Sequence, residues 1–293
     1  MYPTAEWFLM DGFQAVCSNR HGGYKTTHQF RHFAGFRSVE EFAALVNVAR
    51  DHHLPVYILG KGSNTYFASR TVHTAVLKNE LPETIEVVDE NDHVITVDIS
   101  SSTSIMKVLR FCENNGLDSF YFLASVPGNV GGSLAMNAGG PEGTETIFDF
   151  LDQVTVCDSR TVRQIPKSEI PIGHRHTPFT GQHEKLIVSA RFTFRRTCLT
   201  ESPVRKRIDW YKTHQDTSGP SLGSVFKDGN GYVFGALKRL NFGMLGSHWS
   251  SKYGNWIVCK RGSLLGIRLC IFAARFLHVA IGRRIELEVI KVK

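Results

Sequence analysis

Two glycine-rich segments, residues 59–64 and 125–140, carry the residue types with the clearest chemical meaning in this chain. Glycine lets a backbone approach a ligand closely, and clustered backbone N–H groups form concave sites for phosphate groups. The longer segment lacks the Gly-Lys-Ser/Thr end of a Walker loop and the Gly-x-Gly-x-x-Gly order of a Rossmann turn. It therefore indicates either a pyrophosphate cradle of another design or an ordinary glycine-rich turn.

The charge balance favours an anionic ligand. The formal net charge is +7 and the sequence pI is about 9.1, which attracts phosphorylated molecules, nucleic acid or membrane. The basic residues lie in short, dispersed clusters without a recognised nucleic-acid motif, so they form either a solvated surface or a site for an anionic substrate. The six cysteines are far apart with no C-x-x-C pair, so we expect neither a disulfide scaffold nor a metal site.

The 293 residues suit two domains or one large one. Ser38 and Glu41 have capping-box spacing and predict a helix over 38–50, followed by a buried strand over 55–60. A polar connector at 195–220 is where we place the domain boundary. The other expected elements are strands at 72–77, 85–88, 93–97, 148–157, 186–194, 256–259 and 285–292, helices at 104–114, 231–240 and 264–280, and a strand or turn at 221–226.

The apolar stretch 264–282 raises the question of a membrane span. Arg268, Arg275 and His278 interrupt it, which favours an amphipathic helix facing the core. The first residues have no basic region followed by an apolar one, as a signal peptide would. We therefore expect a soluble, cytoplasmic protein.

The order of several motifs resembles one family of flavoproteins. Residues 59–64 read L-G-K-G-S-N, residues 127–132 P-G-N-V-G-G and residues 136–139 M-N-A-G. Together they resemble the FAD-binding domain of the vanillyl-alcohol oxidase/PCMH superfamily, and within it the UDP-N-acetylenolpyruvoylglucosamine reductase (MurB) family.

The resemblance extends over nearly the whole chain. Residues 173–179, 221–227, 250–258 and 285–289 are similar to the family's G-Y-R-x-S-x-F, S-x-G-S-V-F-K-N, S-E-K-H-A-N-F-I-V and L-E-P-E-V. It implies an α+β fold of the short form, in which 1–200 form a PCMH-type two-part FAD-binding domain and 201–293 a smaller α/β substrate-binding domain.

The activity that the resemblance implies is NADPH-dependent reduction of a UDP-N-acetylglucosamine enolpyruvyl ether in peptidoglycan precursor synthesis. FAD would be bound non-covalently, and NADPH would supply the hydride. A UDP-sugar would be the small-molecule partner of a monomer, with no nucleic acid and no membrane. The alternatives are a PCMH-type FAD oxidoreductase for another anionic substrate and a catalytically weak flavin-binding homologue.

The resemblance also assigns roles to individual residues. Ser224 takes the place of the proton donor to C2 of the enolpyruvyl group. Arg175 would pair with its carboxylate, because a guanidinium fork matches a carboxylate and stays charged. Glu288 would polarise the enolate, with Glu286 as an alternative register. Lys212 and Lys227 would bind substrate, although Lys212 is equally a solvated connector residue.

The FAD-binding residues that the resemblance implies share the two glycine-rich segments. They are Gly60, Lys61, Gly62, Ser63, Asn64, Pro127, Gly128, Gly131, Gly132, Ser133, Asn137 and Gly139. Three positions depart from the family pattern: His174, Asp228 and Tyr253 replace a tyrosine, an asparagine and a histidine. These changes bear on the substrate more than on the flavin.

Overall fold

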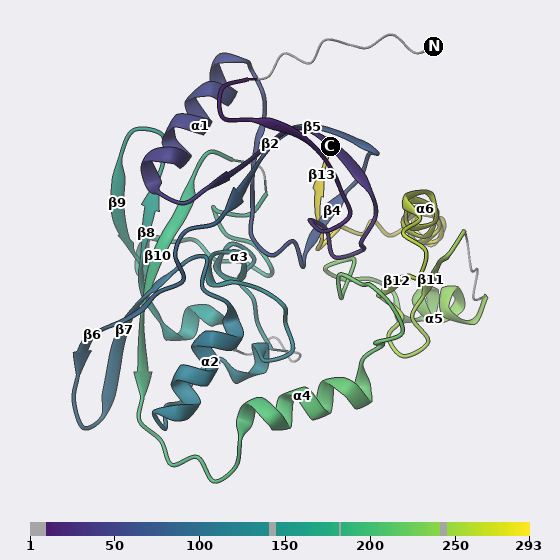
Figure 1. Ribbon diagram of the computed structural model, residues 1–293. Coiled ribbons are helices and arrows are strands. Elements are labelled where there is room, and N and C mark those ends of the chain that lie inside the picture. The colour runs from purple at the N-terminus through teal and green to yellow at the C-terminus, as the bar shows by residue number, and fades with distance from the viewer. Residues whose placement is uncertain (1–9, 141–144, 182, 241–244) are drawn as a thin grey trace.

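The computed structural model describes residues 10–140, 145–181, 183–240 and 245–293 (Figure 1). Its first sheet has the order β1-β2-β5-β3. The parallel pairs β2·β5 and β3·β5 form its centre, and β1 is antiparallel to β2. The strands are β1 (Gln14–Ser18), β2 (His28–Phe36), β3 (Val56–Leu59) and β5 (Thr71–Asn79).

Helix α1 (Val39–Asp51) packs against the first sheet. Ser38 starts it as expected, because its side chain accepts from the N–H of Glu41 at 3.2 Å. The helix buries Phe42, Leu45, Val46 and Ala49 in a core shared with β2 and β5. Apolar residues three and four apart thus form the face that holds the helix on the sheet.

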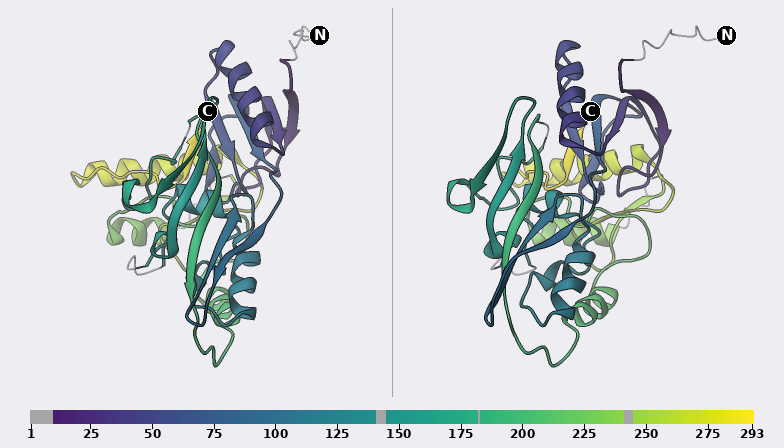
Figure 2. Two further views of the ribbon diagram at one scale, coloured as in Figure 1. Left: turned by 90° about the vertical axis from the view of Figure 1, so that its left-hand side faces the viewer. Right: turned by 60° about the vertical axis from the view of Figure 1, so that its left-hand side comes forward.

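The second sheet is antiparallel throughout, with the order β6-β7-β10-β8-β9. Helices α2 and α3 lie beside it (Figure 2). The apolar cluster between them includes Val97, Phe120, Leu134, Phe192 and Phe194. The elements are β6 (Ile85–Glu90), β7 (Val94–Ser100), α2 (Ile105–Asn114), η1 (Tyr121–Leu123), α3 (Val130–Ala135), η2 (Ile147–Phe150), β8 (Leu151–Cys157), β9 (Val162–Pro166), η3 (Lys167–Glu169) and β10 (Leu186–Arg195).

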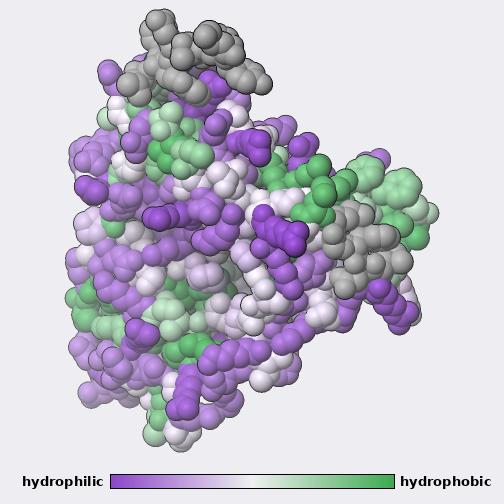
Figure 3. Space-filling view, turned by 45° about the vertical axis from the view of Figure 1, so that its right-hand side comes forward, coloured by the Kyte–Doolittle hydropathy of each residue, from purple (hydrophilic) through white to green (hydrophobic). Residues whose placement is uncertain are grey.

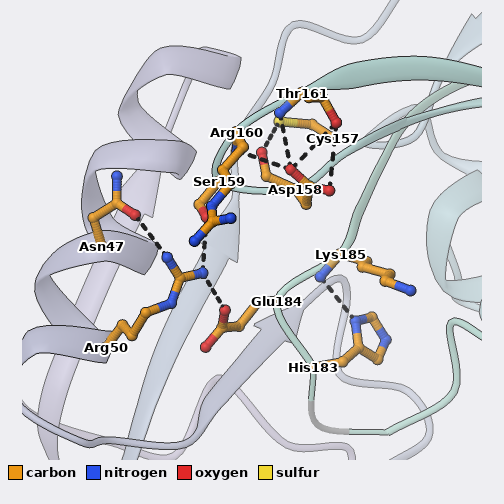
Figure 4. Close-up of polar contacts among 10 residues, drawn as sticks. All are labelled: Asn47, Arg50, Cys157, Asp158, Ser159, Arg160, Thr161, His183, Glu184 and Lys185. Atoms are coloured by element: carbon orange, nitrogen blue, oxygen red, sulfur yellow. Dashed lines mark hydrogen bonds and ion pairs between the residues drawn. The ribbon is translucent and has the colours of Figure 1, made fainter.

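A polar cluster joins the two sheets (Figure 4). The guanidinium of Arg50, at the end of α1, donates to Ser159 at 2.8 Å and to Glu184 at 2.5 Å. Ser159 lies in the turn between β8 and β9, and Glu184 precedes β10. The ties are partly exposed, so their role is to set the relative placement of the sheets more than to add stability.

The C-terminal part of the chain forms a third layer beside the first sheet (Figure 1). Its core includes Phe226, Phe234, Trp249, Ile267 and Ala274. The last strand pairs in parallel with a strand of the N-terminal part of the chain, with Ile290 opposite Thr65. The elements are α5 (Gly231–Leu240), β11 (Ser247–Trp249), β12 (Ile257–Cys259), α6 (Leu264–Ala280), and the pair β13 (Ile290–Val292) and β4 (Thr65–Phe67). Helix α4 (Pro203–His214) leads to this layer and packs on α2 and η1 instead.

The structure departs from the sequence-based expectations mainly in the short elements. The connector expected at 195–220 contains α4, whose start is fixed by Ser202 accepting from the N–H of Arg205 at 3.0 Å. The strand expected over 285–292 is reduced to β13, and residues 221–226 form a turn with single bridges. The expected strand over 148–157 begins as the 3₁₀ helix η2. No helix in the described part of the chain could cross a membrane.

Candidate functional site

A cavity of about 590 Å³ lies where the two sheets and the C-terminal layer meet. Both glycine-rich segments line it, together with side chains from the C-terminal part of the chain. The expected site residues that line this cavity are Gly60, Lys61, Gly62, Ser63, Asn64, Pro127, Gly128, Gly131, Gly132, Ser133, Gly139, Arg175, Ser224 and Glu288. The fold therefore brings together residues that lie as much as two hundred positions or more apart in the sequence.

The first glycine-rich turn follows β3 directly and presents its backbone to the cavity. Gly62 has φ +73°, and a Cβ atom there would lie 2.1 Å from the carbonyl oxygen of His21, so only glycine fits. Lys78 also holds the turn, since its Nζ donates to the carbonyl of Gly60. No acceptor among the described residues bonds the N–H groups of 61–64. This turn therefore offers unpaired donors to an anion.

In the second segment, residues 130–133 contribute close packing, because their N–H groups already have acceptors. The N–H groups of Val130, Gly131, Gly132 and Ser133 donate to protein oxygens, at 3.0, 2.9, 3.1 and 2.9 Å. A Cβ atom at Gly60 would lie 2.6 Å from the side-chain oxygen of Asn129. The two segments thus touch, and glycine is what lets them meet at the cavity wall.

Arg175 is held in a strained but fully specified position. Its φ is +52°, a region that a non-glycine residue rarely adopts. Its terminal nitrogens donate to the carbonyls of Asn137 and Gly139, both at 3.3 Å, and its Nε lies 3.4 Å from Glu288 Oε1. A guanidinium carries five N–H groups, so one on each terminal nitrogen remains for a ligand.

Glu288 is the carboxylate that faces Arg175. Its side chain is 18% exposed, and burial raises its pKa, while the charges of Arg175 and Lys227 act in the opposite direction. Glu286, two residues earlier, has a side chain that is 78% exposed and lies 3.3 Å from Lys227 Nζ. Glu288, and not Glu286, therefore lines the cavity. The chain bends at residues 288–289, so the two side chains do not share a face as they would in a regular strand.

Ser224 lies on a turn that is fixed from two sides. Asn255 accepts from the N–H of Val225 at 2.9 Å through its carbonyl, and its side chain bonds both polar backbone groups of Phe226. On the other side, the N–H of Glu288 donates to the carbonyl of Val225 at 2.8 Å. The turn and Glu288 are thus one connected unit, which sets the position of the hydroxyl in the cavity.

Three expected residues lie outside the cavity lining as the described residues form it. Lys212 is exposed on α4 and lies 3.2 Å from Asp209. Lys227 lies beside Glu286. Asn137 lies behind the wall with φ +42°, donates to the carbonyl of Gly173 at 2.9 Å, and has a buried side-chain oxygen without a partner among the described residues.

The cavity also has a wall that the sequence did not reveal. Arg207, Trp210 and Tyr211 of α4 line it, as does Asp216, which is 7% exposed. The Arg207 guanidinium carbon lies 4.2 Å from the centre of the Trp210 ring, a cation–π contact. The sequence indicated a solvated connector here, and the aromatic residues within that charged stretch were the available signal for a packed helix.

The residues present fit a flavin dinucleotide on two structural grounds. The turn at 61–64 supplies unpaired N–H donors of the kind that hold phosphate, and the volume and concave shape are those of a cofactor site. No cluster of three or more His, Cys, Asp or Glu side chains suited to a metal ion occurs among the residues described.

Comparisons with known proteins bear directly on this site. Residues 31–161 match the model of a family described as an FAD binding domain. The chain is 29% identical to the UDP-N-acetylenolpyruvoylglucosamine reductase of Myxococcus xanthus, covering 78% of this chain and 74% of that one. It is 26% identical to the enzyme of the same name from Chlamydia trachomatis, covering 84% of this chain and 83% of the relative.

The three-dimensional comparison covers the whole fold. The crystal structure of the enzyme of that name (MurB) from Thermus caldophilus superposes with a TM-score of 0.75 at 17% identity, over 96% of this chain and 99% of that one. This chain belongs to the UDP-N-acetylenolpyruvoylglucosamine reductase family. The expected family and α+β fold are confirmed, and the domain that contains both glycine-rich segments is an FAD-binding domain.

Proposed function

We propose that this protein reduces UDP-N-acetyl-3-O-(1-carboxyvinyl)-glucosamine to UDP-N-acetylmuramate, with NADPH as the hydride donor and FAD bound non-covalently. One observation carries the proposal: Arg175, Ser224 and Glu288, from three distant segments, line the same cavity as the glycine-rich turn at 60–64. When bound, FAD supplies a centre that accepts hydride from NADPH and passes it to the enolpyruvyl group. The relatives named above carry the name of this activity.

The role of Arg175 follows from its remaining donors. Hydride addition to C3 of an enolpyruvyl ether places negative charge on C2 and the carboxylate. The two free N–H groups of Arg175, one on each terminal nitrogen, match a carboxylate as a fork. Because the protein already fixes the guanidinium through Asn137, Gly139 and Glu288, little reorganisation is needed as the charge develops, which is the basis of electrostatic catalysis.

Ser224 and Glu288 would complete the chemistry at C2. A serine hydroxyl is a weak acid, so it donates a proton only to a strongly basic enolate in a fixed geometry, and the turn held by Asn255 supplies that geometry. The burial that raises the pKa of Glu288 places its carboxyl within a partly desolvated wall beside the same turn. We assign Ser224 as the proton donor and Glu288 as the group that orients the enolate.

We retain two finer expectations as parts of this proposal. Residues 1–200 would form the flavin domain and residues 201–293 the substrate domain of a monomer that acts in the cytoplasm. Lys227 would bind the substrate from the edge of the site, since it lies beside Glu286 outside the cavity lining. Lys212 would do so only if α4 presented it to the bound nucleotide, since it faces away from the cavity lining.

The test is an assay of NADPH oxidation with and without the enolpyruvyl nucleotide. We expect oxidation to depend on the nucleotide. Ser224→Ala should slow the transfer from reduced flavin to substrate by at least about a hundredfold, the usual contribution of a positioned acid, while flavin reduction by NADPH is kept. Thr217→Val removes another hydroxyl that lines the cavity and is the matched control. An unchanged second half-reaction in Ser224→Ala would refute the assignment.

A further inference from the structure

Helix α6 exposes an apolar face at the edge of the molecule. Leu265, Phe272, Phe276 and Val279 are 54%, 66%, 61% and 62% exposed. With one residue every 100°, these positions fall on a single side of the helix. The rings of Phe272 and Phe276 stack at 6.1 Å between centroids, so the face is continuous.

The opposite side of α6 accounts for the packing that the sequence predicted. Ile267, Cys270, Ile271, Ala274 and His278 are buried against the C-terminal core. The helix is therefore apolar on two sides, and among the described residues only one of these sides is packed against the core. In Figure 2 α6 projects from the body, and in Figure 3 hydrophobic side chains gather at the corresponding edge.

The charged residues of α6, and of the chain segments on either side of it in the sequence, have one sign. Arg268 and Arg275 are exposed along one flank of the apolar side. From Gly229 to Ile285 the sequence has nine basic residues and no aspartate or glutamate. The nine are Lys238, Arg239, Lys252, Lys260, Arg261, Arg268, Arg275, Arg283 and Arg284.

We propose that α6 is a docking element for an anionic membrane surface, into which Leu265, Phe272, Phe276 and Val279 insert while the arginines contact lipid phosphates. A helix with phenylalanine and leucine on one face and arginine beside it lies in the interface of a bilayer. Each arginine near an anionic leaflet adds attraction. This proposal replaces the expectation of no membrane partner, and it is independent of the proposed function.

The same features disfavour a second copy of the chain as the occupant. Two copies that met through this face would bring two stretches without acidic residues together, and like charges in contact oppose association. The face also lies on a helix that projects from the body of the molecule (Figure 2), as an element that lies on a flat surface would. An anionic bilayer offers a flat surface for the projecting helix and negative charge for its arginines.

The experiment is co-sedimentation of the full-length, flavin-loaded protein with vesicles. Vesicles of phosphatidylcholine alone are compared with equal mixtures of phosphatidylcholine and phosphatidylglycerol, at low and high salt. We expect binding to the anionic vesicles that is at least tenfold stronger than to the neutral ones. High salt should weaken it, because screening shortens the range of the attraction.

Two double variants separate the components of the surface. Phe272→Ser with Phe276→Ser should reduce partitioning more than tenfold. Arg268→Gln with Arg275→Gln should reduce it about thirtyfold, from about 1 kcal/mol for each arginine. Both should keep the melting temperature and the NADPH oxidation rate in solution.

The matched controls change exposed residues of the same types elsewhere. Val87→Ser with Val88→Ser alters exposed valines on β6, and Arg160→Gln with Arg163→Gln alters exposed arginines near β9. These controls should bind vesicles like the parent. Equal binding to neutral and anionic vesicles, or undiminished binding of the phenylalanine variant, would overturn the proposal. Binding to an acidic protein without binding to anionic vesicles would overturn it equally.

Discussion

Replacing Ser250 by alanine tests how the cavity wall around Asp216 is held. Ser250 is fully buried and donates its hydroxyl proton to Asp216 at 2.7 Å. Its oxygen also accepts from the N–H groups of Lys252 and Tyr253, both at 3.1 Å. The substitution therefore removes one bond to a charged group and leaves two backbone donors without their acceptor.

The pKa of Asp216 supplies part of the magnitude. Burial acts to raise this pKa, but hydrogen bonds from Ser218 and Ser250 outweigh it and hold the value at about 2, against an ordinary 3.8. At about 1.4 kcal/mol for each pKa unit, this lowering corresponds to about 2 kcal/mol shared among these bonds. With the two orphaned N–H groups added, we expect Ser250→Ala to lower the free energy of unfolding by about 2 kcal/mol at pH 7.

The pH dependence distinguishes this cause from a simple packing defect. Because the pKa of Asp216 is lowered by folding, its contribution is present above about pH 4 and is lost as pH falls toward about 2. The difference in free energy of unfolding between the parent and the variant should therefore narrow over that range, and the part due to the two N–H groups should remain.

The assay is denaturant unfolding between pH 2 and pH 7, with Ser251→Ala as the control because Ser251 is the exposed neighbour. The control should match the parent at every pH. Equal stability of Ser250→Ala and the parent at pH 7, or a constant difference at all pH values, would refute the role given to the Ser250 bond.

Three further predictions concern the cavity. Burial raises the pKa of Glu288, so its ionisation lowers the stability of the parent as pH rises from about 4.5 through the raised value. Glu288→Gln removes this ionisation. In denaturant titrations, its free energy of unfolding relative to the parent should therefore increase from pH 4 to pH 8. Gly62→Ala should lower the free energy of unfolding by about 3 kcal/mol or more, because the new Cβ would meet a carbonyl oxygen. It should also release the flavin, which is measured as a loss of protein-bound absorbance. The control Gly235→Ala places its Cβ in open space inside α5 and should be neutral or stabilising. Asn255→Ala should slow transfer to substrate but keep bound flavin, since it positions Ser224; an unchanged rate would contradict that role.

The sequence predicted the longer elements well because their signals are local. The cap at Ser38 and the apolar positions of α1 lie within a few residues of each other, and β5 and β10 are continuous apolar or alternating runs. The helix α4 escaped prediction because its contacts are distant: Arg207 donates to the carbonyl of Phe122 at 3.1 Å. A charged stretch with one apolar face, read alone, is typical of a solvated connector.

The sequence by itself determined the family, through the order of its motifs, and the candidate residues Arg175, Ser224 and Glu288. Only the tertiary structure decided which groups meet. It made Glu288 and not Glu286 the partner of Arg175, because the backbone bonds beside Val225 fix the register of the last segment.

The tertiary structure also changed the meaning of the two glycine-rich segments. The sequence predicts backbone donors in both, since glycine content is alike in each. In the fold, the N–H groups of residues 130–133 already have acceptors in Thr103, Ser101 and the helix-capping Asn129. No acceptor among the described residues bonds the N–H groups of 61–64. Which donors remain for a phosphate depends in part on acceptors from another segment, here Ser101 and Thr103, and a local sequence pattern does not contain that information.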